Sequence, residues 1–462
     1  MTNNLHEESD VAGTLTVEEL SVEVAAGRVD TVVLAAADMQ GRLQGKRLSA
    51  RFFLEEVAAH GMEGCAYLLA VDVDMNPVSG FAMSSWDTGY GDFVFRPDLA
   101  TLRNIPWQEG TAFLMADLAW AGGGEVVASP RQVLRRQLGK LAERGWTAQV
   151  GTELEFVVYR DSYEEAQRRA YRDLTPANLY NVDYSLLGTS RVEPLLRAIR
   201  LGMEGAGLYV ESAKGECNLG QHEIAFRYAD ALTTCDNHAI YKNGAKEIAA
   251  AQGVSITFMA KPNQREGNSC HIHLSLRTPS GEPVMAAPAE PYGLSQVGRH
   301  FVAGQLACLR DMTLLFAPNI NSYKRFAGSS FAPTAGSWGL DNRTCALRLI
   351  GSGLSLRVEN RVPGADVNPY LAVAAMIAGG LYGIERELPL EAPYDGNAYL
   401  SGAERLPGTL HEALSLFEAS PIARDLFGDE VVDHYANAAR VEIDAFDSAV
   451  TDWEMFRGFE RL

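Results

Sequence analysis

The chain contains no run of apolar residues long enough to cross a lipid bilayer, which takes about 20 of them in a row. Its opening residues, MTNNLHEESD, are polar and acidic, which is not the composition of a signal peptide. We therefore expect a cytoplasmic protein that has no membrane partner.

The chain has few cysteines, and its basic residues are fewer than its acidic ones. The six cysteines among 462 residues form no CxxC pair, so we expect reduced thiols rather than a disulfide framework. The 40 lysines and arginines are outnumbered by 59 aspartates and glutamates, which gives a net charge of −19. Nucleic-acid-binding proteins usually present a basic face, so no nucleic acid partner is expected.

What the chain does have is ionisable residues at every second position of apolar stretches. Glu153 and Glu155 alternate in GTELEFVVY, and alternate side chains of a strand share one face. Carboxylates held that close repel each other unless a proton or a cation intervenes. Glu216 and Glu223 bracket a turn in GECNLGQHE. The same alternation occurs in SCHIHLSL and LRVENRV, with His271, His273, Ser275, Arg357, Glu359 and Arg361. These patterns predict a sheet around a charged, metal-filled pocket.

Periodicity predicts a small mixed region followed by a larger one. In the first we expect helices at 15–26 and near 49–60, with two strands between them. Further strands are expected through AYLLAVDVD, GDFVFRPD and GTAFLMADLAW. The glycine run 122–124 is a plausible boundary.

The larger region begins with a predicted helix, for which Ser129 is the expected N-cap and Pro130 the first-turn residue. A long functional loop with a short helix is expected at 160–195. We also predict one helix over 292–316, an Ala-rich helix that starts at Asn368 and Pro369, and a helical remainder.

The chain resembles the type I glutamine synthetases from end to end. The motifs that carry the resemblance are DMQGRLQGKR, GTELEF, GECNLGQHE, KPNQREGNSCHIHLSL, APNINSYKRF, DNRTCALR and RVENRVPGADVNPYL. Seven motifs in the family's order make this similarity highly specific. It implies an α+β fold with an N-terminal β-grasp domain and a catalytic domain on a curved antiparallel sheet.

The resemblance also implies a domain layout and an assembly. We expect a flexible tail at 1–14, the β-grasp domain at 15–125 and the catalytic domain at 126–462. It further implies a homo-oligomer, a dodecamer of two stacked rings, with active sites between neighbouring subunits.

Residue roles follow from matching the family's motifs. One metal site is implied at Glu155, Glu216 and Glu223, and a second at Glu153, His271 and Glu359. Gly267, Arg325 and Arg361 are implied to hold glutamate, and Arg325 and Arg343 to act in catalysis. Contacts to the nucleotide phosphates are implied for His273, Ser275, Arg343, Arg348 and Arg357.

These residue types suit phosphoryl transfer independently of the family. Carboxylate-rich ligation fits Mg²⁺ or Mn²⁺, and arginines hold the charge that develops on phosphate oxygens. The implied reaction uses ATP to phosphorylate the γ-carboxylate of glutamate, after which an amine displaces phosphate. A non-catalytic relative would have lost some of the metal ligands, whereas all six predicted metal-ligand residues are present in this sequence.

One position departs from the family. The flap glutamate that closes the family's site over ammonium is replaced by Phe331 in GSSFAPT. An aromatic ring offers a surface for methylenes or a face for a cation, so we expect an organic primary amine as acceptor, with Phe331 part of its site. Ethanolamine is favoured, polyamines or ammonium are the alternatives, and Phe331 as ordinary loop packing is an equal competitor.

Two further questions stay open at the level of sequence. The proton acceptor could be Asp72, Asp74 or Asp87, because the family's aspartate motif is absent. The stretch Asn397–Ala398–Tyr399 departs from the family's modification motif, which argues against adenylylation of Tyr399.

Overall fold

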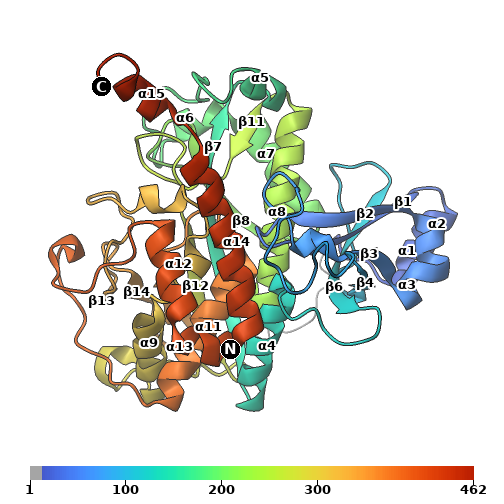
Figure 1. Cartoon of the computed structure of the whole chain (residues 1–462). Helices are drawn as coiled ribbons and strands as arrows, with labels where there is room; N and C mark the ends of the chain where they lie inside the picture. Colours follow the sequence, from blue (N-terminus) through green and yellow to red (C-terminus); the bar gives the residue numbers. More distant parts are fainter. Residues whose placement is uncertain (1–12) are drawn as a thin grey trace.

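The computed structural model describes residues 13–462, so most of the tail expected at 1–14 lies outside the described residues. Two β-sheets and the helices around them form an α+β fold (Figure 1). The strands of the first sheet lie between residues 31 and 120, and those of the second between residues 147 and 360. The domain boundaries expected at 125/126 remain a prediction.

The first sheet is mixed. Strand β1 pairs in parallel with β6 at its centre, and the other neighbours on the main path are antiparallel. This order is consistent with the expected β-grasp. The strands in sheet order are β2 (Leu43–Ser49), β1 (Thr31–Ala37), β6 (Thr111–Trp120), β4 (Asp92–Pro97) and β3 (Met62–Cys65), while β5 (Arg103–Asn104) pairs with β6.

The helices of this region match the sequence prediction, and one strand does not. Helix α1 (Val17–Ala25) has a capping box, and residues 50–60 form one helical stretch with a π-helical centre. The strand expected through AYLLAVDVD is wrong. Ala66–Leu69 is a 3-10 helix, and the Asp72 carboxylate accepts a hydrogen bond from the backbone of Asn76 at 2.8 Å. Such a side-chain-to-backbone bond favours a turn over a strand.

The second sheet carries the charged strands. All its pairs are antiparallel except β13 with β14, and β10 (Ala229–Asp230) and β11 (Ser255–Thr257) pair with β7 outside the main path. The main path is β13 (Trp338–Leu340), β14 (Leu347–Ile350), β15 (Arg357–Asn360), β12 (Cys270–Arg277), β7 (Thr147–Tyr159), β9 (Gln221–Phe226) and β8 (Val210–Gly215).

Helices surround this sheet, and two helix predictions need correction. The stretch 292–316 holds two helices, interrupted at 309–312. Residues 386–409 contain a 3-10 turn and no α-helix, because Pro389, Pro393 and Pro407 interrupt helical hydrogen bonding. The helices are α4 (Pro130–Glu143), α5 (Tyr163–Arg168), α6 (Leu186–Ser190), α7 (Glu193–Gly205), α8 (Ala231–Ala251), α9 (Gln296–Cys308), α10 (Thr313–Phe316), α11 (Pro369–Glu385), α12 (Leu410–Ala419), α13 (Pro421–Phe427), α14 (Asp429–Ser448) and α15 (Asp452–Gly458).

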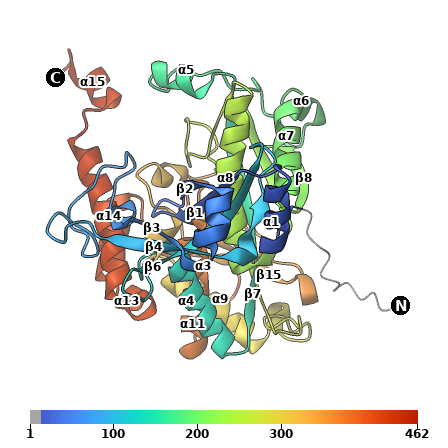
Figure 2. The same cartoon turned by 90° about the vertical axis from the view of Figure 1, so that its right-hand side faces the viewer.

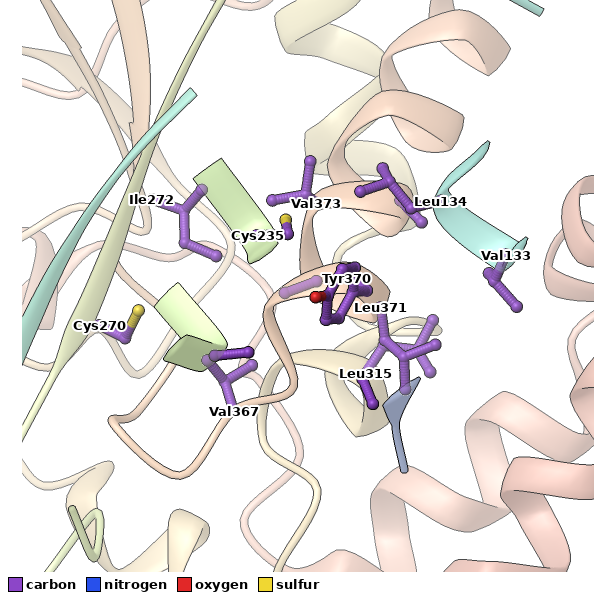
Figure 3. Close-up of a cluster of buried hydrophobic side chains, with 14 of the residues drawn as sticks. Val133, Leu134, Cys235, Cys270, Ile272, Leu315, Val367, Tyr370, Leu371 and Val373 are labelled. Atoms are coloured by element: carbon purple, nitrogen blue, oxygen red, sulfur yellow. The ribbon is translucent and has the colours of Figure 1, made fainter. Parts of the chain in front are cut away.

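Helix α11 lies at the centre of the core. It is apolar on all sides and packs against α9, α4 and α8, as expected for a helix buried all round. Figure 3 shows its Tyr370, Leu371 and Val373 among side chains from α4, α8 and β12. The Asn368 side chain caps the helix and also donates hydrogen bonds to the carbonyls of Asp38 and Met39. The predicted N-cap Ser129 holds its position without a side-chain capping bond.

A buried arginine joins the two sheet regions. Arg131 of α4 pairs with Asp236 of α8 at 2.8 Å and with Asp98 and Asp117 of the first region at 2.7 and 2.6 Å. Figure 2 shows the first sheet and α1 in front of the helices α4 and α8, while α15 stands away from the body. No helix in residues 13–462 is long and apolar enough to span a bilayer.

Candidate active site

The two glutamates of strand β7 lie over a cavity of about 1030 Å³ that is partly open to solvent. Glu153 stands opposite His271 of β12, and Glu155 stands opposite Glu223 of β9. Strand alternation therefore aims both carboxylates into one cavity, as the sequence predicts, and pairing adds partners from strands on either side.

Glu155, Glu216 and Glu223 form the first predicted metal cluster. Ligand oxygens of the three lie within 4.8 Å of one another. Burial, reinforced by Glu153 and Glu155, raises the pKa of Glu223 to about 8, although Lys214 opposes the shift. Crowded, buried carboxylates of this kind fit a hard divalent cation, which would neutralise charge on phosphate oxygens.

The second cluster has two histidines in reach. His271 Nδ1 lies 3.3 Å from Glu153 and 3.4 Å from Glu359, and His273 Nε2 lies 2.9 Å from Glu153. Burial opposes ionisation of Glu153, but hydrogen bonds to both imidazoles outweigh it and hold its pKa well below the usual range. Glu153, His273 and Glu359 also group within 4.8 Å, so either imidazole could complete this site.

Arginines line the same cavity. Arg361 and Arg348 contact the buried carboxylate of Glu359 at 2.6 and 2.9 Å. Arg325 is buried and donates to the carbonyls of Val362 and Arg361. Burial lowers the pKa of Arg325 to about 10, which still leaves it charged at neutral pH.

Gly267 makes room for this arrangement. A Cβ at that position would lie 2.9 Å from Cγ of Arg325 and would collide with the carbonyl of Ala260. The three residues predicted to hold glutamate, Gly267, Arg325 and Arg361, therefore line one side of the same cavity.

The predicted nucleotide contacts divide between two adjoining cavities. His273, Ser275 and Arg357 line a second cavity of about 1110 Å³, which shares Glu153 with the first. Arg343 and Arg348 line the first. An elongated ligand that lies across Glu153 could contact all five.

The flap segment brings Phe331 to the mouth of the first cavity. Its side chain is 58% exposed, and its backbone has φ +58°, in the left-handed region. The Tyr399 hydroxyl donates a hydrogen bond to the Ala332 carbonyl at 3.0 Å, which ties the flap segment to the residues around Tyr399. Asp341, the first acidic residue after it, pairs with Arg348 at 2.5 Å. The described chain thus supplies no unpaired carboxylate in place of the missing flap glutamate on this segment.

The structure adds pocket residues that sequence reasoning missed. Lys214 donates a hydrogen bond to Glu216, and Gln221 donates one to Glu155. Each of the two residues precedes a predicted metal ligand by two positions, so strand alternation could have predicted that its side chain faces the cavity. Asp183, in the aperiodic loop, gave no such signal. Asp72, Asp74 and Asp87 are not among the residues lining this cavity.

Comparison with known proteins places the chain in a family. The sequence pattern of "Glutamine synthetase, catalytic domain" matches residues 127–457. The chain belongs to the glutamine synthetase family. It is therefore a ligase that forms C–N bonds.

Individual relatives are similar over nearly their full length. A "Gamma-glutamylethanolamide synthetase GlnA4" of Streptomyces coelicolor is 67% identical, with 97% of this chain and 96% of that protein covered. A "Glutamate--isopropylamine ligase" of a Pseudomonas species is 41% identical, over 93% and 95%. The solved structure "GmaS/ADP complex-Conformation 1" has a TM-score of 0.83 at 26% identity, over 96% of this chain and 99% of that one.

Proposed function

We propose that the chain is an ATP-dependent γ-glutamyl-amine ligase whose acceptor is an organic primary amine. The observation that carries the proposal is that all five family carboxylates and four of the family arginines line one cavity, whose flap presents Phe331 in place of a carboxylate. The named activities of two relatives support it, since both join glutamate to an organic amine.

The roles of the residues follow from where they stand. Glu155, Glu216 and Glu223 would hold one divalent cation, and Glu153 and Glu359 with a histidine would hold another, Mg²⁺ or Mn²⁺ in each case. Gly267, Arg325 and Arg361 would bind glutamate, with Arg325 and Arg343 stabilising charge during transfer. The phosphates of ATP would contact His273, Ser275, Arg343, Arg348 and Arg357.

The proposed reaction has two steps, phosphorylation of glutamate and then displacement of phosphate by the amine. An oxygen of the γ-carboxylate of glutamate attacks the terminal phosphorus of ATP, and ADP leaves with the electrons of the broken P–O bond. The nitrogen lone pair of the amine then attacks the γ-carbonyl carbon of the acyl phosphate. The C–O bond to phosphate breaks, the amide forms, and the amine loses its extra protons to solvent or to a neighbouring base.

Ethanolamine is the acceptor we favour. The 67% identical relative is named for it, and the methylenes of ethanolamine could contact the Phe331 ring that lines the cavity. Putrescine or spermidine would carry a second cation and favour an acidic entrance. Ammonium would favour a flap carboxylate, which this chain lacks.

Assembly belongs to the proposal as well. Members of this family form homo-oligomers, and we infer a dodecamer of two rings for a cytoplasmic enzyme. Trp453, Phe456 and Phe459 of the C-terminal segment are 67–84% exposed, which suits an element that packs against another subunit. Mass photometry of the purified protein would test the number of subunits.

Phosphate release tests the function. Purified protein would be assayed with Mg²⁺, ATP and glutamate against ethanolamine, putrescine, spermidine, methylamine and ammonium, with products identified by mass. We expect γ-glutamylethanolamide as the main product. A higher kcat/KM with ammonium than with every organic amine would overturn the proposal.

A further inference from the structure

Three carboxylates that line the active-site cavity, Glu155, Asp183 and Glu266, form no ion pair within residues 13–462. Glu155 is a predicted metal ligand and accepts hydrogen bonds from Gln221 and from the backbone of Ser269. The cavity carboxylates Glu153 and Glu359 are paired with histidines or arginines, and Glu216 and Glu223 with Lys214. Asp183 lines the same cavity, and no ion pair is found for it in residues 13–462. Its side chain is exposed, and within residues 13–462 its carboxylate accepts a hydrogen bond from the thiol of Cys217, at 3.6 Å. A thiol is a weak donor, so this carboxylate keeps acceptor capacity for a ligand.

The loop that carries Asp183 is held in place. The backbone N–H of Asp183 donates to Asn181 Oδ1 at 2.8 Å, and the neighbouring Val182 is fully buried. Tyr184 has φ +53°, in the left-handed region, and Ser185 caps helix α6. Asp183 therefore sits between a buried anchor and a capped helix.

Strand β8 brings this loop to the metal-ligand hairpin. Gly215 lies against the carbonyl oxygen of Val182, where any Cβ would collide with it. The absence of a side chain there allows close approach of the loop to the strand. Asp183 is thereby placed beside Glu216 and Cys217, with the three ligand atoms within 4.8 Å of one another.

The chain's own lysine shows that this wall stabilises an alkylammonium group. The Lys214 ammonium hydrogen-bonds Glu216 and lies 5.1 Å from the centre of the Tyr184 ring. That combination of a carboxylate and an aromatic face binds alkylammonium ions generally. Phe331 lines the same cavity and adds a second aromatic side chain.

We propose that the Asp183 carboxylate binds the amine substrate, accepting a hydrogen bond from its ammonium group or from the hydroxyl group of an amino alcohol. The proposal rests on the proposed function and names the residue that its acceptor site uses. Asp183 is a binding residue here, and the carbons of the amine lie toward Phe331 and Tyr184.

The amine is assigned to a different residue from those that bind glutamate and ATP. Glutamate and ATP are assigned to Arg325, Arg361 and the β12–β15 side of the cavities, whereas Asp183 belongs to the loop before α6. Removing the negative charge of Asp183 should therefore change the KM of the amine and leave the other two KM values alone.

The test measures initial rates of phosphate release for the wild-type protein, Asp183→Asn, Asp183→Glu and the control Asp173→Asn. Asp173 is an exposed loop aspartate that does not line the cavity, so the control makes the same chemical change elsewhere. The KM values of ethanolamine, glutamate and ATP are determined separately for each protein.

For Asp183→Asn we expect the KM of ethanolamine to rise about tenfold or more, as for loss of one charge-assisted hydrogen bond, with the KM of glutamate and ATP within about twofold. Asp183→Glu should recover part of the amine affinity, and Asp173→Asn should match wild type. An unchanged amine KM in Asp183→Asn, or an equal rise for all three substrates, overturns the inference. Failure of the proposed function shows separately, as a wild-type protein that prefers ammonium.

Discussion

Arg361 donates a hydrogen bond to the carboxylate of Glu359 at 2.6 Å, and both side chains are almost completely buried. The two residues lie on the same short stretch, and Arg361 also donates to the Arg343 carbonyl at 3.1 Å. A single guanidinium thus connects a predicted metal ligand with a loop that carries a predicted phosphate contact.

Arg361→Lys tests this connection. Lysine keeps the charge but loses the planar fork, so the bond to Glu359 and the bond to Arg343 cannot both be kept. We expect kcat/KM for glutamate to fall about 10- to 100-fold, the loss of one charged hydrogen bond. Steady-state rates with glutamate varied measure this. Arg144→Lys, on the surface, serves as control, and an Arg361→Lys protein with wild-type kinetics contradicts the assignment.

Glu155→Gln tests the first metal cluster. The change keeps the shape and removes one negative charge from Glu155, Glu216 and Glu223. We expect the affinity for Mn²⁺, measured by calorimetry without substrates, to fall about tenfold or more. Mutation of residues that only hydrogen-bond to metal ligands already lowers metal affinity by about that factor. The Mg²⁺ concentration for half-maximal activity should rise in step. Glu282→Gln, in an exposed turn, is the matched control; equal Mn²⁺ affinity in both variants would refute the cluster.

Phe331→Glu tests the flap. It restores a carboxylate at the mouth of the cavity, where Phe331 is 58% exposed. We expect kcat/KM for ammonium to rise about tenfold and that for ethanolamine to fall, because an added negative charge attracts a small cation and an apolar contact is lost. Phe331→Leu keeps an apolar side chain and should retain the amine preference. If neither variant changes the ratio of ammonium to ethanolamine turnover, Phe331 is ordinary packing.

Arg131→Met tests the contact between the two sheet regions. Arg131 is 1% exposed and neutralises three aspartates, so its removal leaves uncompensated buried charge on Asp236. We expect the free energy of unfolding to fall by about 3–5 kcal/mol. Arg135 contacts two of the same aspartates but is 36% exposed, so Arg135→Met should cost much less. Denaturant unfolding compares the two, and similar losses would contradict this account.

His434 predicts a pH dependence of stability. Burial lowers its pKa to about 3, and its ring lies against Phe81, with Nε2 3.0 Å from Met39 Sδ. The unfolded chain binds a proton with a pKa of about 6.5, so the contribution is complete above that pH and is lost as the pH falls toward 3. Melting temperatures of wild type and His434→Gln from pH 7.5 to pH 5 check this. The wild-type curve should fall more steeply; parallel curves would exclude His434 as the cause.

Local sequence pattern was enough to predict the strands of the site and the faces that their side chains share. In a strand the side-chain period is two, so Glu153 with Glu155 and His271 with His273 had to point the same way. The Ala-rich pattern likewise predicted α11 from Asn368 onward, and apolarity on all sides required its burial. Where local rules competed, prediction failed: turn chemistry at Asp72 overrode a strand, and three prolines removed a helix from 386–409.

Which of these faces meet depends on contacts between segments that lie far apart along the chain. The register that sets Glu153 opposite His271 joins segments 118 residues apart, and a shift of one residue would turn every side chain to the other face. Local sequence carries no record of such a register, because packing of both sheet faces fixes it. For the same reason Asp183 escaped notice: its place beside Cys217 depends on Gly215 of another strand, which only the folded chain brings into contact with its loop.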